Sequence, residues 1–85
     1  MTKSAEVTLH NEVGLHARPA SRFTETASRY RADITVVKDG EEADAKSLLT
    51  LLTLDVRKGD TIRIVADGED ADAAVDALVA LVDSL

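Results

Sequence analysis

The fold class is decided by the stretch DITVVKDGEEAD, residues 33–44. Asp33–Lys38 is rich in β-branched side chains, which is typical of a strand. Asp39-Gly40 follows directly and predicts a tight hairpin turn, because both residues tolerate a positive φ. The return strand, Glu41–Asp44, is short and acidic, as suits an exposed sheet edge. The two strands are therefore expected to be antiparallel, which excludes an all-parallel sheet.

Two further strands are predicted on either side of this hairpin. Val7–His10 alternates apolar and polar residues, with Val7 and Leu9 on one face, and Thr61–Ala66 alternates in the same way. A period of two predicts strands with one buried face.

Three segments have the pattern of a helix. Apolar residues recur at steps of three and four in Ala17–Tyr30 and in Ala71–Leu85, so each predicts a helix with one buried stripe. Pro19 lies in the first turn of the earlier helix, where its missing N–H costs nothing, and it places the helix start close to His16. Ser47–Leu52 is a short apolar run behind a candidate N-cap serine, and it predicts a short helix.

The resulting order of elements is β-α-β-β-α-β-α. An antiparallel sheet with helices on one face closes this order most simply, so an α+β two-layer domain is predicted. A chain of 85 residues has room for one compact core, and residues 1–85 are expected to form a single domain.

The composition argues against several classes of function. Ten Lys and Arg against sixteen Asp and Glu give a net charge of −6, which argues against nucleic acid or an anionic membrane surface as a partner. There is no cysteine and no apolar run as long as a membrane span, so disulfides, thiolate chemistry and membrane insertion are not expected. The N-terminus lacks the apolar core of a signal peptide, and a cytoplasmic location is expected.

The candidate for chemistry is the stretch GLHARPA, residues 14–20. His16 lies where a loop enters a helix, and a helix N-terminus with its unpaired N–H groups binds anions. Arg18 adds a guanidinium suited to phosphate oxygens, and Gly14 permits a close backbone approach. A histidine in this place could accept a phosphoryl group.

The alternative is that His16 is an ordinary surface histidine and Arg18 a solvated charge. The sequence has no phosphate-binding glycine loop, no second histidine at metal-ligand spacing and no carboxylate pair beside a nucleophile. Neither a metal nor a cofactor is therefore expected, and His16 would depend on other proteins to complete its chemistry. His10 is interpreted as an exposed polar residue at the end of a strand.

Residues 14–20 and a second block, AKSLL at residues 45–49 followed by Leu52, Leu54 and Lys58-Gly59, resemble the HPr family. Its members are phosphocarriers of the bacterial phosphoenolpyruvate-dependent sugar phosphotransferase system. The resemblance covers essentially the whole chain. It implies an open-faced β-sandwich, in which three helices cover one face of a four-stranded antiparallel sheet.

The resemblance also implies a function. His16 would carry the phosphoryl group on Nδ1, take it from enzyme I and pass it to sugar-specific enzyme IIA domains, as a carrier and not as an enzyme. The helix N-terminus at Ala17 and Arg18 would hold the phosphate, and the Arg18 side chain would stabilise the transfer state. A carrier that offers one face to several partners is most simply a monomer.

Ser47 matches the regulatory serine of the family, which a dedicated HPr kinase phosphorylates in some bacteria. Two other functions therefore stay open beside the sugar carrier. One is a carrier in a regulatory, nitrogen-type phosphotransferase branch. The other is a regulatory binding module on the same fold that signals through Ser47.

The resemblance further implies a docking face, which would combine Leu48, Leu49 and Leu52 with the residues around His16. Leu48 and Leu49 could equally be core residues of a short helix. Position 50 is Thr and position 52 is Leu, where some members of the family carry a basic and a polar residue. These departures make the docking face more apolar.

Overall fold

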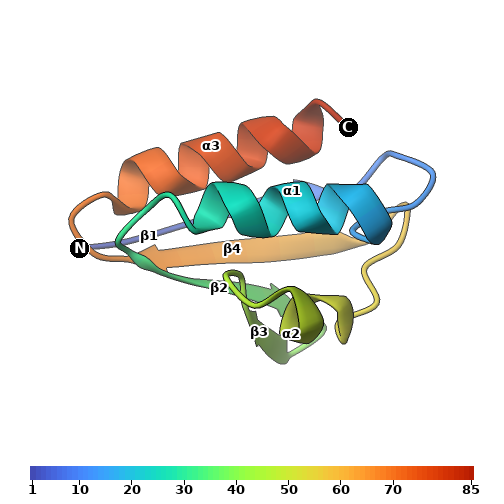
Figure 1. Cartoon of the computed structure of the whole chain (residues 1–85), viewed down its shortest axis with the longest axis horizontal. Coiled ribbons are helices and arrows are strands. Elements are labelled where there is room, and N and C mark those ends of the chain that lie inside the picture. Colours follow the sequence, from blue (N-terminus) through green and yellow to red (C-terminus); the bar gives the residue numbers. More distant parts are fainter.

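Four strands and three helices follow one another in the predicted order. The computed structural model describes all 85 residues, and its elements are β1 (Thr2–Thr8), α1 (Ala17–Ala27), β2 (Asp33–Lys38), β3 (Glu41–Asp44), α2 (Leu48–Leu52), β4 (Thr61–Asp67) and α3 (Ala71–Asp83). The strands form one sheet in the order β1-β4-β2-β3, and every neighbouring pair is antiparallel. Helices α1 and α3 lie side by side over one face of the sheet, and α2 contacts α1 and β3 (Figure 1). The predicted open-faced fold is confirmed. No helix has both the length and the hydrophobicity that a membrane crossing requires.

The β2–β3 hairpin forms as the Asp-Gly pair predicts. Asp39 and Gly40 have φ angles of 50° and 81°, and Lys38 lies opposite Glu41 across the turn. A two-residue turn with both φ angles positive has a twist that matches the flanking strands. The hairpin joins the rest of the sheet where β2 pairs with β4.

The core lies between the sheet and the helices. In β4 the side chains of Ile62, Ile64 and Ala66 are buried, and those between them face the open side of the sheet. Helix α1 contributes Phe23, which is fully buried. The buried stripe of α3 consists of Ala71, Ala74, Val75, Leu78 and Val82. All buried apolar side chains belong to one cluster, so the loops at both ends of the sheet are attached to the same core.

Strand β1 differs from the predicted strand. It runs from Thr2 to Thr8, whereas the sequence pattern predicts Val7–His10. The whole of β1 pairs with β4. The residues of its first half are exposed or only partly buried, and Lys3 pairs with Asp72 of α3 at the surface, at 3.7 Å. The first half of the strand is therefore defined by its backbone pairing with β4, far along the chain, which no local pattern reveals.

Helix α1 ends at Ala27, earlier than the predicted end at Tyr30, although Tyr30 still packs against the core. The carboxylate of Asp70 holds the loop that follows, because it accepts hydrogen bonds from the backbone N–H groups of Arg31 at 2.8 Å and Ala32 at 2.9 Å. These hydrogen bonds, that of Arg31 first, lower the pKa of the Asp70 carboxyl. Asp70 stands at the N-cap position of α3 but gives that helix no side-chain cap. It ties the start of α3 to the loop after α1.

Candidate functional site

His16 lies where the loop after β1 enters α1. It is the N-cap residue of α1, with φ −120° and ψ 163°, and its side chain makes no capping hydrogen bond. The next residue, Ala17, has a φ of 52°, a left-handed conformation that costs a non-glycine residue about 1–2 kcal/mol. The imidazole is 39% exposed. It is therefore available both to groups of this chain and to a reacting group from outside.

The loop before His16 rests on the segment between α2 and β4. Gly14 has a φ of +58°, and a Cβ there would overlap the carbonyl oxygen of Val56 and lie 2.7 Å from Cα of Arg57. The N–H of Leu15 donates to the carbonyl of Val56 at 3.0 Å, and the Leu15 side chain is buried. The close approach expected of Gly14 is thus made to the protein's own backbone. It brings His16 next to the segment that follows α2.

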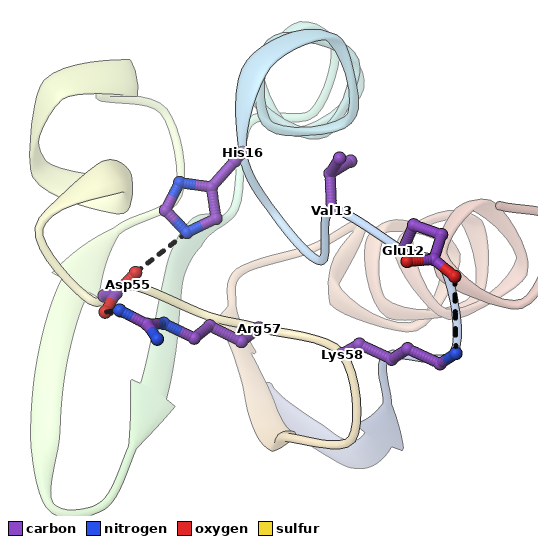
Figure 2. Close-up of a pocket in the computed structure, with 6 residues that line it drawn as sticks. All are labelled: Glu12, Val13, His16, Asp55, Arg57 and Lys58. Carbon is purple, nitrogen blue, oxygen red and sulfur yellow. Dashed lines mark hydrogen bonds and ion pairs between the residues drawn. The ribbon is translucent and has the colours of Figure 1, made fainter.

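One carboxylate of that segment faces the imidazole. Oδ1 of Asp55 lies 3.0 Å from Nε2 of His16 (Figure 2). Oδ2 of Asp55 accepts from Arg57, with Nη2 at 2.8 Å and Nε at 3.0 Å. The pairing with Arg57, and to a smaller extent that with His16, lowers the pKa of the Asp55 carboxyl. Asp55 is therefore ionised at neutral pH and bridges His16 and Arg57.

The surface is hollowed around these side chains. A cavity of about 460 Å³ is lined by Glu12, Val13, His16, Asp55, Arg57 and Lys58 (Figure 2). Lys58 Nζ pairs with the carboxylate of Glu12 at 3.6 Å. The lining thus holds two cations and two anions around the imidazole.

Arg18 does not line this cavity. It lies in the first turn of α1, where it is exposed and makes no ion pair with any carboxylate of the chain. The cations that share the cavity with His16 are Arg57 and Lys58; the sequence assigned neither to the site, and Lys58 figured only in the block that carries the resemblance. Their stretch, DVRKGD at residues 55–60, is dense in charge, but by itself it indicates only a turn. Asp55 was missed for the same reason.

Helix α2 presents apolar side chains to solvent beside this site. Leu49 is 80% exposed and Leu48 38% exposed, whereas Leu51 is fully buried. Leu52 is partly buried against the core, and Val13, in the cavity, is half exposed. The core contact of α2 therefore comes from Leu51, and the alternative that Leu48 and Leu49 are core residues is wrong.

Ser47 is the N-cap residue of α2, as the sequence predicts. Its hydroxyl accepts a long hydrogen bond of 3.4 Å from the N–H of Thr50, and it lies 2.8 Å from the hydroxyl of Thr50. The neighbouring Lys46 donates from Nζ to the carbonyl of Tyr30 at 2.7 Å. The ammonium group of Lys46 is thus engaged in the loop after α1, and Ser47 remains partly accessible.

Comparison with known proteins points to one family. A family model described as the PTS HPr component phosphorylation site matches residues 3–84. The chain is 48% identical over 83 residues to the phosphocarrier protein HPr of Vibrio cholerae, which is 98% of this chain and 95% of that protein. It is 47% identical over 85 residues to the phosphocarrier protein NPr of Shewanella violacea, which is 99% of this chain and 93% of that protein.

A solved structure agrees with these relatives. The crystal structure of HPr-C-His from Thermoanaerobacter tengcongensis superposes with a TM-score of 0.95 at 39% identity, and the match covers 96% of this chain and 92% of that chain. Fold, motifs and relatives thus lead to the same conclusion. The chain belongs to the HPr family of the phosphotransferase system, and it is a phosphocarrier and not an enzyme.

Proposed function

We propose that His16 carries the phosphoryl group between enzyme I and sugar-specific enzyme IIA domains in the cytoplasm. The observation that carries this proposal is the half-exposed imidazole at the N-cap of α1, whose Nε2 faces the carboxylate of Asp55. The His16 side chain makes no capping hydrogen bond to α1, and with Nε2 at Asp55 the lone pair of Nδ1 is available to an incoming phosphorus atom.

The transfer is a displacement at phosphorus in each direction. Nδ1 of His16 forms a bond to phosphorus while the bond between phosphorus and enzyme I breaks, and the second step repeats this exchange toward enzyme IIA. The phosphoryl oxygens lie at the N-terminus of α1, where the first N–H groups, those of Ala17 and Arg18, have no partner within the helix. The Arg18 side chain, which has no ion pair of its own, supplies a charge-assisted contact to the same oxygens.

The docking surface is formed by Leu48, Leu49 and Leu52 together with the rim of the cavity. Leu48 and Leu49 are exposed, and α2 stands beside His16 because Asp55 follows α2 directly and contacts the imidazole. Large exposed apolar side chains that cluster together are typical of a protein interaction site. One such surface serves donor and acceptors in turn, and the carrier acts as a monomer.

Phosphorylation of Ser47 by an HPr kinase regulates this docking. Ser47 precedes Leu48 and Leu49, and its hydroxyl is part of the surface. A phosphate there adds close to two negative charges at the edge of an apolar contact, which repels acidic partners and is costly to desolvate.

The deciding experiment is phosphorylation by enzyme I and phosphoenolpyruvate. The wild type and the control His10→Ala are expected to acquire an acid-labile, base-stable label, because His10 is exposed and lies outside the cavity. His16→Ala is expected to fold normally and to acquire none. A label that persists in His16→Ala would refute the assignment.

The labelled protein also separates the candidate pathways. Transfer of the label to sugar-specific enzyme IIA domains supports the proposed function. Transfer only to an enzyme IIA of a nitrogen-type branch would identify a regulatory carrier. Phosphorylation at Ser47 by an HPr kinase without any labelling by enzyme I would identify a regulatory binding module.

A further inference from the structure

We infer that Asp55 is a positioning residue for His16: its carboxylate holds the imidazole in the tautomer that carries the proton on Nε2 and presents the lone pair of Nδ1. The inference rests on the proposed function of His16. It assigns a role to a residue that lies far from His16 in the sequence and meets it only in the folded protein.

For a neutral imidazole, the contact admits one arrangement of protons. An ionised carboxylate can only accept hydrogen bonds, and Oδ1 of Asp55 lies 3.0 Å from Nε2 of His16. A neutral imidazole has a single N–H, which must therefore be on Nε2. Nδ1 then bears the lone pair, on the side of the ring that faces away from Asp55 (Figure 2).

The carboxylate is itself held in place. Arg57 binds Oδ2 through both Nη2 and Nε, at 2.8 and 3.0 Å, and leaves Oδ1 to the imidazole. Fixing one oxygen with a planar guanidinium restricts the rotation of the carboxylate. Arg57 thus fixes the carboxylate of Asp55, and this carboxylate in turn orients the imidazole of His16.

The backbone beneath this pair is also anchored. Lys38, at the end of β2, donates from Nζ to the carbonyls of Leu54 at 3.1 Å and Asp55 at 2.8 Å. Its ammonium group also pairs with Asp60 at 3.1 Å, and Asp60 accepts the backbone N–H of Arg57 at 2.8 Å. Asp55 itself has a φ of 49°. Asp tolerates this left-handed conformation better than most non-glycine residues, and the hydrogen bonds from Lys38 hold the backbone in place here.

The contact matters for the transfer because the imidazole gains a positive charge when it is phosphorylated. When Nδ1 bonds to phosphorus while Nε2 keeps its proton, the imidazole ring becomes cationic. Asp55 already lies 3.0 Å from the proton-bearing nitrogen, so the new positive charge is met by a carboxylate and no proton has to leave. In the return step the same proton lets the ring depart as a neutral imidazole. An aspartate orients a catalytic histidine by a similar hydrogen bond in serine proteases, although that aspartate is buried and Asp55 is 49% exposed.

The test compares Asp55→Asn with Asp39→Asn. Both positions have a left-handed backbone, with φ angles of 49° and 50°, so the two variants make the same chemical change in the same conformation and lose the same charge. Asn tolerates this conformation well. Asp39 lies in the β2–β3 turn and does not line the cavity.

The first readout is the tautomer of each histidine in ¹⁵N-labelled protein, from two-bond ¹H–¹⁵N correlations at about pH 9, where an imidazole is neutral. His10 is exposed and pairs with no carboxylate, so it is the internal reference. In the wild type and in Asp39→Asn, His16 is expected to show a larger Nε2–H fraction than His10. In Asp55→Asn this difference should shrink, which a purely structural role of Asp55 would not produce.

The second readout is the rate of phosphoryl transfer from enzyme I. Loss of a hydrogen bond to a charged group is expected to slow Asp55→Asn roughly ten- to hundredfold, with Asp39→Asn at the wild-type rate. A wild-type tautomer ratio or a wild-type rate in Asp55→Asn overturns the inference and leaves the proposed function intact. A wild type that enzyme I does not label at His16 overturns the proposed function, and the inference falls with it.

Discussion

Two guanidinium groups lie close to His16, one in the sequence and one in space, and they differ in what they can offer a phosphate. Arg57 binds Asp55 through two nitrogens. The carboxylate raises the pKa of the Arg57 guanidinium, and its negative charge balances the positive charge of Arg57. Arg18 is exposed and makes no ion pair. An unpaired cation gives up no existing ion pair when it turns to an incoming anion. Arg18 is therefore the group expected to stabilise the transfer.

Arg18→Ala is expected to accept phosphate at His16 but to transfer it roughly ten- to hundredfold more slowly, because a charge-assisted contact contributes about 1.5–3 kcal/mol. Rapid-quench kinetics of label transfer from phosphorylated His16 to an enzyme IIA domain measure this rate. Arg29→Ala is the control, since Arg29 is also exposed and lies beyond the end of α1. Equal slowing of both variants would indicate a general effect of net charge and would contradict the role of Arg18.

Gly14→Ala is expected to destabilise the protein by about 2–4 kcal/mol in denaturant unfolding. Part of this cost is the positive φ, at about 1–2 kcal/mol, and the rest is the overlap of a Cβ with the backbone of Val56 and Arg57. Gly40→Ala isolates the first part, because Gly40 has a φ of +81° but open space around it. If both variants lose the same stability, the close packing of the loop on the segment after α2 contributes nothing.

At the scale of the elements, α2 combines a structural cap with the proposed regulatory site. Ser47→Ala is expected to cost at most about 1 kcal/mol, because its cap hydrogen bond is long at 3.4 Å. Ser47→Asp is expected to keep the wild-type Tm, since Asp is also a good N-cap residue. It should be phosphorylated by enzyme I more slowly, because it adds a negative charge beside Leu48 and Leu49.

Ser4→Asp serves as the control for this charge. Ser4 is exposed on β1, at the far edge of the sheet from β3, so a carboxylate there leaves the docking surface unchanged. Tm by circular dichroism and the initial rate of labelling test both halves of the prediction. If the Ser47→Asp variant is phosphorylated by enzyme I at the wild-type rate, or is unfolded, Ser47 is only a cap.

The elements that the sequence predicts best are those with a local signal. The β2–β3 hairpin follows from Asp39-Gly40 alone, and the start of α1 follows from Pro19. The first half of β1 could not be predicted, because its place depends on its pairing with β4, more than 50 residues later in the chain. The site divides in the same way, since His16 is marked by its neighbours in the sequence. Asp55 is marked only by a contact that exists after folding.

At the scale of the whole molecule, acid is expected to loosen the connection between α3 and the loop after α1. The pKa of Asp70 is lowered from 3.8, first of all by the hydrogen bond from the N–H of Arg31. A carboxyl with a lowered pKa in the folded state stabilises the fold above its ordinary pKa, and this contribution is lost as the pH falls through the lowered value. Asp70→Asn should therefore lower Tm at pH 7, and its Tm should converge with that of the wild type in strong acid.

Thermal unfolding from about pH 7 down to about pH 2 follows this convergence. Asp76→Asn is the control, because Asp76 is an exposed carboxylate of the same helix and makes no ion pair. Its Tm should match that of the wild type throughout. A difference between Asp70→Asn and the wild type that persists unchanged in acid would mean that Asp70 acts through its shape and not through its charge.

The contact between His16 and Asp55 joins two segments that are separated in the chain by α1, the hairpin and α2. A chain still emerging from the ribosome has its histidine long before it has the carboxylate that orients it. A misfolded or partly unzipped copy has both but cannot bring them together. The oriented imidazole therefore forms only when the chain has folded. With Asp55 as the positioning residue inferred above, the ability of His16 to accept a phosphoryl group reports that the chain has finished folding.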